Sequence, residues 1–241
     1  MEMRNHIIVL LTLVFFITSC AKNTYTGTVK TWSHNKAEIA IPADKPIIIG
    51  EIDKKGNVVI KLEEELAENL KSIRLESNKS GNIKMKNKTV REAFYCKPET
   101  VIVNNGDENI EKVAFGSRFV VANINKEKLY GYLRLVSSKT FNESYFALGK
   151  KDFVKGFYID FFYVEKDASV NGICKTKTYT MDMKSTVELI HEYDINLKKG
   201  WNIVKIEIVE TYVDGEKRTP LKTVMTTVKE LPENTQFILF N

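Results

Sequence analysis

The segment Phe157-Tyr158-Ile159-Asp160-Phe161-Phe162-Tyr163-Val164 decides the fold class. It belongs to an apolar run from Val154 to Val164 whose side chains alternate with a period of two instead of 3.6. One face carries Phe157, Ile159, Phe161 and Tyr163, and the other carries Tyr158, Phe162 and Val164 together with Asp160. Because both faces are apolar, the segment predicts a central β-strand that is covered on both sides.

The same period of two extends in both directions along the chain. Before the central strand, β-branched runs at Pro46–Ile52 and Val58–Leu62 flank the turn Asp53-Lys54-Lys55-Gly56-Asn57, which predicts a hairpin. Around and after it, further strands are expected at Arg118–Ile124, Leu129–Val136, Lys175–Met181, Thr186–Ile195, Trp201–Val213, Leu221–Lys229 and Gln236–Phe240. One helix is expected at Glu63–Lys71, where leucines recur at helical spacing and acidic residues lie near the N-terminal end.

The composition is that of an ordinary folded chain. Of 241 residues, 43% are hydrophobic and 28% are charged, which is too apolar for an intrinsically disordered chain. We therefore expect an all-β fold of two β-sandwich-like halves with one short surface helix. The first half spans residues 25–110 and the second spans residues 111–241, with the turn-rich segment Asn104–Asn109 as the linker.

The N-terminal segment is typical of a bacterial lipoprotein signal peptide. The apolar run from Ile7 to Ile17 has about half of the roughly 20 residues that a transmembrane helix needs. The sequence Ile17-Thr18-Ser19-Cys20-Ala21 then resembles the bacterial lipobox, in which small residues precede a lipid-modified cysteine. The resemblance implies that residues 1–19 are removed and that Cys20 becomes a diacylglyceryl cysteine carrying acyl chains such as palmitate.

Lipidation of Cys20 implies a membrane-anchored protein with a short tether, residues 20–24. Two or three acyl chains, at about 0.8 kcal/mol per buried methylene, hold a protein on a membrane almost permanently. Lipoproteins that Bacteroidota send to the cell surface tend to have acidic residues after this cysteine, whereas Ala21-Lys22-Asn23 follows here. This resemblance favours the periplasmic face of the outer membrane over surface exposure. The net charge of +5 is no argument for nucleic acid, which an exported protein rarely meets.

Known catalytic patterns are not found in the sequence. It has no G-x-S-x-G, P-loop or dinucleotide-binding motif and no HExxH or C-x-x-C spacing, so we expect no catalytic residue, metal or cofactor. His191 shares the apolar face of its strand and is interpreted as a core histidine, and His34 as a loop histidine. Carboxylates that are distant in sequence can still meet in a cleft, so a carboxylate-dependent hydrolase stays open.

Two further sets of residues leave alternatives open. Cys96 and Cys174 either form a disulfide, which an oxidising compartment allows, or stay separate buried thiols. Tyr130, Tyr132 and Arg134 alternate along one strand, and they form either an aromatic face for a ligand such as a glycan or part of the core.

The second half also resembles an uncharacterised Bacteroidota lipoprotein family. The resemblance lies in the aromatic strand Phe161–Val164 leading into Gly172-Ile173-Cys174, and in Leu197-Lys198-Lys199-Gly200-Trp201-Asn202 opening a later strand. It implies a fold and an envelope location but no chemistry.

We therefore expect a non-enzymatic, lipid-anchored envelope protein that binds a partner or acts as a scaffold. The first alternative is a surface-exposed glycan-binding accessory lipoprotein, and the second is the carboxylate-dependent hydrolase. The membrane is contacted through the N-terminal lipid, and the other partner is an envelope protein or a glycan.

Lipidation is tested by the variant Cys20→Ser. We expect the wild type to incorporate radiolabelled palmitate and to fractionate with membranes, because the thiol is the acceptor of the diacylglyceryl group. The variant should do neither. Equal membrane association of both forms would contradict the lipobox interpretation.

Overall fold

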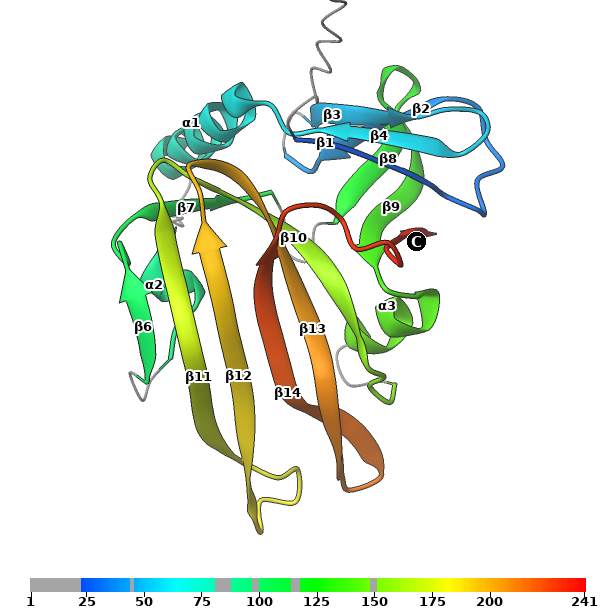
Figure 1. Ribbon diagram of the computed structural model, residues 1–241. Coiled ribbons are helices and arrows are strands. Elements are labelled where there is room, and N and C mark those ends of the chain that lie inside the picture. The colour runs from blue at the N-terminus through cyan, green and yellow to red at the C-terminus, as the bar shows by residue number, and fades with distance from the viewer. Residues whose placement is uncertain (1–22, 44–45, 81–87, 97–99, 114–117, 148–150) are drawn as a thin grey trace, which may run out of the picture.

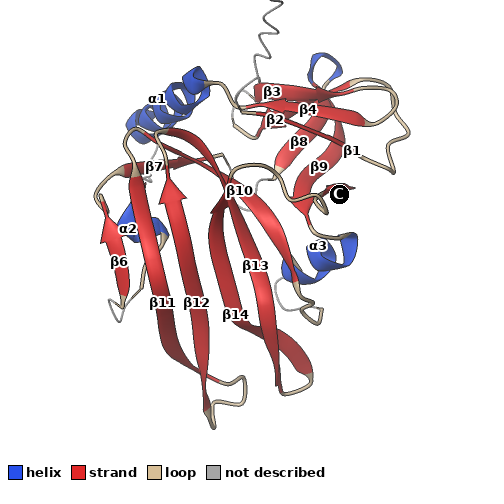
Figure 2. Cartoon of the chain, viewed as in Figure 1, coloured by secondary structure: helices blue, strands red, loops and turns tan. Residues whose placement is uncertain are grey.

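The computed structural model describes residues 23–43, 46–80, 88–96, 100–113, 118–147 and 151–241 (Figure 1). The expected signal peptide and the expected lipidation site, Cys20, lie outside the described residues. Strands dominate what is described (Figure 2), so the expectation of an all-β fold is confirmed. In the described residues, no helix is long and apolar enough to cross a membrane.

The strands of the first part of the chain are short. They are β1 (Thr24–Thr28), β2 (Ala37–Ile41), β3 (Ile47–Ile52), β4 (Asn57–Lys61), β5 (Lys88–Thr89), β6 (Val101–Asn104), β7 (Asn109–Lys112), β8 (Phe119–Asn123) and β9 (Lys128–Val136). The later strands include the long ones. They are β10 (Gly156–Val164), β11 (Ala168–Tyr179), β12 (Thr186–Leu197), β13 (Gly200–Asp214), β14 (Lys217–Val228) and β15 (Gln236–Phe240). The helical segments are α1 (Glu64–Ser80), α2 (Val90–Ala93), η2 (Ile124–Lys126) and α3 (Lys139–Tyr145).

The described strands form one sheet of 15 strands. Its order is β1-β4-β3-β2-β8-β9-β10-β13-β14-β12-β11-β6, with β15 added to β9, and with β7 paired to both β10 and β5. The predicted hairpin is β3–β4, and each later strand that the sequence predicts is present, β15 with the predicted ends and the others with shifted ends. In Figure 1 the short strands β1–β4 lie at the top and the long strands β10–β14 run towards the bottom.

β10 is the central strand that the sequence predicts. It pairs with β13 along its whole length, from Gly156↔Ile208 to Val164↔Gly200. Its other edge is shared, since β9 pairs with it at Tyr158 and β7 pairs with it from Phe162 to Val164. All side chains from Phe157 to Phe162 are buried.

Two hydrophobic cores lie on the two faces of β10. Phe157, Ile159 and Phe161 belong to a core shared with β1–β4, β8, β9 and α1. Tyr158, Phe162 and Val164 belong to a second core shared with α2, β11 and β12. The alternation seen in the sequence therefore assigns each side chain of β10 to one core or the other.

The expected boundary between residues 110 and 111 does not divide the sheet. β7 runs across that boundary and pairs with β10, and β6 pairs with β11. In the other direction, β8 pairs with β2. The segment Asn104–Asn109 is thus the turn between β6 and β7 and not a linker, because strands from both halves complete one shared sheet.

The helix α1 is longer than the expected Glu63–Lys71, although its apolar side faces the core as predicted. Leu66 is 5% exposed and Leu70 packs against the same core. The added C-terminal residues have only two large apolar side chains, Ile73 and Leu75, and Leu75 is 52% exposed, so the apolar period weakens there. A contact that is distant in sequence also holds this part of the helix.

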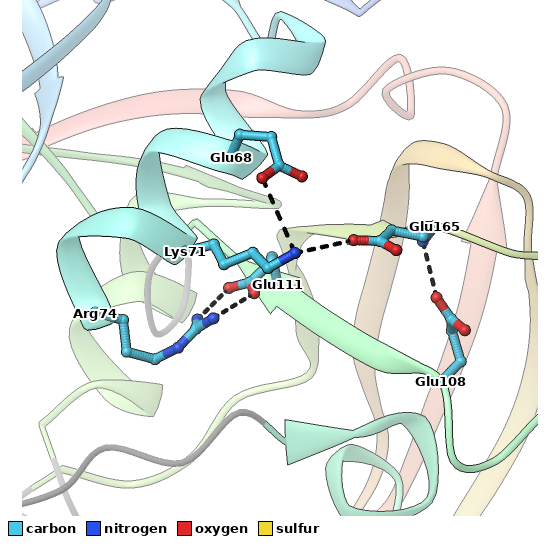
Figure 3. Close-up of polar contacts among 6 residues, drawn as sticks. All are labelled: Glu68, Lys71, Arg74, Glu108, Glu111 and Glu165. Carbon is cyan, nitrogen blue, oxygen red and sulfur yellow. Dashed lines mark hydrogen bonds and ion pairs between the residues drawn. The ribbon is translucent and has the colours of Figure 1, made fainter. Parts of the chain in front are cut away.

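That contact is a two-point ion pair between α1 and β7 (Figure 3). Arg74 Nη1 and Nη2 lie 2.5 and 2.8 Å from Oε2 and Oε1 of Glu111, and both side chains are mostly buried. One turn earlier, Lys71 Nζ lies 3.4 Å from Glu165 in the β10–β11 turn. The backbone N–H of Glu165 in turn donates to Glu108 at 3.1 Å. Paired, partly buried arginine–carboxylate contacts of this kind fix geometry strongly, so α1 is held against both β7 and the end of β10.

Cys96 and Cys174 form a disulfide in the structure, with Cα atoms 5.7 Å apart. The two residues are separated by 78 positions. Cys96 precedes β6, and Cys174 lies in β11 beside it. Thr100 strengthens the same junction, since its hydroxyl donates to the carbonyl of Ile173 at 2.7 Å.

Removing the disulfide should lower stability substantially. Closing a loop of this length restricts the unfolded chain by about 4 kcal/mol in the chain-entropy model. We expect Cys96→Ala/Cys174→Ala to lose that order of unfolding free energy in urea titrations. A thiol count of the unfolded wild type, with and without reductant, serves as the control, and free thiols without reductant would contradict the pairing.

Candidate functional site

The strand β9 carries the three residues that the sequence predicts as a ligand face, and it separates one of them from the other two. Opposite β9, the register moves from Val121↔Gly131 to Ala122↔Leu129, which leaves Tyr130 in a β-bulge. The Tyr130 ring contacts Trp32 and His34, with ring centres 5.5 and 4.6 Å away. Tyr132 and Arg134 do share a face, so the expectation that all three do is wrong for Tyr130.

Tyr132 and Arg134 belong to a stack of two arginines and three aromatic rings, here called the arginine–aromatic stack. Arg118 lies 4.6 Å from the Tyr132 ring, and the Tyr132 and Phe240 rings are 5.9 Å apart. The guanidinium of Arg134 then lies between two rings, 4.2 Å from Phe240 and 3.6 Å from Phe146. Both arginines are therefore stabilised by ring faces.

Arg134 is a buried cation at the centre of this stack. It is 7% exposed, and its Nη1 donates to Oδ1 of Asn142 at 3.2 Å. Its Nε is buried without a hydrogen-bond partner. Burial, followed by repulsion from Arg118, lowers the pKa of Arg134 to about 10. In the described part of the chain no ion pair is found for either arginine, so the free edge of this guanidinium favours an anion.

An aromatic group lies behind Arg134, where α3 covers β10. The rings of Tyr145 and Tyr158 are 5.1 Å apart, and Phe146 contacts both. Burial and then the charge of Asp160 raise the pKa of Tyr158. The carboxylate of Asp160 is 2.5 Å from Lys112 Nζ of β7, so its charge is compensated by Lys112. The sequence showed Asp160 as the polar exception in an apolar strand but not its partner.

The two described histidines lie far apart in the fold, and neither contacts the arginine–aromatic stack. His191 pairs with Cys174 on one side and Thr223 on the other, and its Nδ1 is buried without a hydrogen-bond partner. Burial lowers the pKa of His191. His34 is exposed beside Tyr130, in a hollow of about 390 Å³ that also includes Lys54 and Lys128. The described residues contain no group of three His, Cys, Asp or Glu side chains placed to hold a metal ion.

A second candidate surface lies at the ends of the two long hairpins, here called the distal tip. Tyr179, Met181 and Met183 are 63%, 68% and 68% exposed in the β11–β12 hairpin. Val213, 63% exposed, lies at the end of the β13–β14 hairpin. The sequence contained a signal for this surface, because two methionines within an otherwise polar turn have no core position to fill.

No family model matches the chain, and neither does a curated protein or a solved structure.

The role of the guanidinium can be tested by changing its shape while keeping its charge. We expect Arg134→Lys to be less stable than Arg134→Met. A lysine ammonium keeps the cost of burying a charge but cannot stack between two rings, whereas methionine fills the same space without charge. Urea unfolding would measure both, with the exposed Arg118→Lys as the control, for which we expect a change within about 0.5 kcal/mol. A lysine variant as stable as the wild type would show that stacking contributes little.

Proposed function

We propose that this chain is a lipid-anchored protein of the cell envelope that acts by binding a partner protein at the distal tip. The lipobox-like sequence around Cys20 supports the anchor. The single observation that carries the binding function is the exposed apolar surface formed by Tyr179, Met181, Met183 and Val213. Folded chains seldom expose several large apolar side chains together unless they are buried against something else.

The two hairpins of the distal tip are tied to each other. The backbone N–H of Met181 donates to both carboxylate oxygens of Asp214, at 2.9 and 3.1 Å. The hydroxyl of Tyr212 donates to the same carboxylate at 3.2 Å, and Asp214 is 6% exposed. Because these bonds join the β11–β12 end to the β13–β14 end, the apolar side chains are presented on a pre-organised support. Little conformational entropy would then be lost on binding.

The residues on this surface are suited to contact with a protein. Methionine adapts its shape to a partner, and tyrosine combines a large apolar ring with a polar hydroxyl. Burying each such side chain fully contributes about 1.5–3 kcal/mol, so three or four can support a specific complex. Binding alone explains this surface, and the proposal assigns no reaction to the protein.

The position of the anchor gives the distal tip a direction. β1, the first described strand, lies at the top of Figure 1, and the ends of the two hairpins lie at the bottom. A lipid on Cys20, only a few residues before β1, would hold the β1 end at the membrane. The distal tip would then point away from that membrane. With the anchor on the periplasmic face of the outer membrane, the partner would be a protein of the periplasm.

A glycan-binding role is the second candidate, and one observation favours it. The hollow beside Tyr130 combines two ring faces, Tyr130 and His34, with the polar side chains of Asn35, Lys54 and Lys128. Carbohydrate sites use such combinations of ring faces and hydrogen-bonding groups. This candidate requires exposure on the cell surface, which protease treatment of intact cells would show.

Site-specific photo-crosslinking in the native cells tests the binding proposal. We expect a photoreactive phenylalanine at Met183 to give a discrete adduct with another protein, and the same probe at Leu75 to give none. Leu75 is the matched control because it is 52% exposed on α1, far from the hairpin ends. The adduct should weaken when Met181→Ser is added, because the apolar contact area falls.

Two results would contradict binding at the distal tip, and a third would favour the glycan-binding candidate. No adduct at Met183, or the same adduct from Leu75, would overturn binding at the distal tip. An adduct that carries glycan instead of protein would favour the second candidate.

A further inference from the structure

A groove, here called the edge groove, runs along β1 and is separate from the partner site proposed at the distal tip. Two hollows of about 650 and 810 Å³ meet at Thr26 and Leu231. One wall consists of β1 and the residues after it, up to Thr31. The other wall consists of residues 227–239, from the end of β14 through the connection to β15, and of further residues from α3 and from the β12–β13 region, including Lys139 and Lys198.

The backbone of β1 is paired on one side only. Each residue from Thr24 to Thr28 is matched to β4, and β1 pairs with no other strand in the described part of the chain. β15, across the groove, pairs there with β9 alone. An unpaired strand edge presents N–H and C=O groups that an added strand can satisfy.

A side-chain contact lies between β1 and β15, which are not paired with each other in the described part of the chain. The Phe237 ring packs directly on Gly27, so a Cβ atom at position 27 would lie 2.1 Å from that ring. Phe237 is buried in the first hydrophobic core. The two strands thus contact each other through the Phe237 ring, and the edge of β1 opposite β4 has no paired strand in the described part of the chain.

The groove walls are polar and carry an unsatisfied group. The Thr26 and Thr28 side chains are exposed on β1. On the opposite wall, the Thr235 hydroxyl oxygen is buried and has no hydrogen-bond partner. A buried hydroxyl without a partner is destabilising, and a ligand that donates or accepts a hydrogen bond there would remove the penalty.

The charged side chains that line the groove indicate which kind of polypeptide segment would bind there. Its lining includes four lysines and two glutamates, which are Lys30, Lys139, Lys198, Lys229, Glu230 and Glu233. Two of the lysines contact acids outside the groove, Lys198 with Asp167 and Lys139 with Glu143. Exposed ion pairs of this kind contribute about 0–1 kcal/mol, so an incoming carboxylate can compete for these lysines.

We propose that the edge groove binds an extended, acidic segment of a partner polypeptide, which adds a strand to β1. Strand addition supplies affinity through backbone hydrogen bonds, and the lysines supply the charge preference. β1 is five residues long, so about 17 Å of extended segment is matched.

The groove also begins where the described chain begins, because Asn23 lines it. Only Ala21 and Lys22 separate Asn23 from Cys20. With Cys20 lipidated, which rests on the proposed function, the edge groove lies within about 10 Å of the membrane surface. The nearest source of an extended segment is then the membrane-adjacent part of another envelope protein.

The test uses a synthetic peptide of alternating threonine and glutamate as the probe. We expect it to bind the purified mature protein in fluorescence anisotropy and to slow hydrogen–deuterium exchange of the β1 amides. Two matched peptides are the controls, one with lysine in place of glutamate and one with alternate backbone nitrogens methylated. The first should bind about tenfold more weakly through charge, and the second should not protect β1, because it cannot pair as a strand.

Protein variants complete the experiment. Lys30→Glu/Lys229→Glu should weaken binding of the acidic peptide about tenfold, whereas Lys177→Glu, which changes an exposed lysine of β11, should not.

Equal binding of the methylated and unmethylated peptides, or no protection of the β1 amides, would overturn strand addition. Protection of β1 in the protein alone with a doubled mass in light scattering would assign the edge to a second copy. Protection by anionic lipid vesicles, with none by peptide, would assign it to the membrane. Each of these results leaves photo-crosslinking at Met183 unaffected, so the two proposals fail separately.

Discussion

The burial of β10 on both faces is the constraint on which the rest of the structure depends. Its side chains alternate between two hydrophobic cores, and its far edge is divided between β9 and β7. A strand used in this way cannot belong to one half of the chain. The cores on its two faces therefore form together, and a large cavity at Phe161, which is fully buried, would affect both the β1–β4 region and the long strands.

The main path of paired strands ends in β6 on one side and in β1 on the other. β6 is held to β11 by the register from Ser169 to Gly172 and by the nearby Cys96–Cys174 disulfide. β1 lies in a groove and is supported by Phe237 packing on Gly27. The groove beside β1 is the physical basis for assigning strand addition to that end of the sheet.

The all-β fold, the central strand, the β3–β4 hairpin and most strand positions could be predicted, because they follow from a local period of two. Most of the errors have causes that are not local. The bulge at Tyr130 depends on how β8 pairs with β9, and its one local signal is the adjacent Gly131, a glycine inside the strand whose φ is 138°. The length of α1 depends on Glu111, which lies 37 residues after Arg74. The expected boundary at residues 110 and 111 falls inside β7, which lies next to β10 only in the folded chain. For the candidate site, the sequence predicted that Tyr132 and Arg134 share a face, but it could not show that Phe146 and Phe240 enclose Arg134.

The arginine–aromatic stack and the distal tip differ in what they cost the folded state. Arg134 is a cation held among rings, and burial, followed by repulsion from Arg118, lowers its pKa. Burying a charge without an opposite charge is costly, and the two ring faces offset part of that cost. The methionines of the distal tip are exposed to solvent, so their side chains add little apolar burial to the stability of the folded chain. The arginine–aromatic stack lies next to β10, since Phe146 contacts Tyr158, whereas the distal tip lies at the ends of the long hairpins. The core thus specifies the fold, while these outer surfaces carry residues that folding alone does not require.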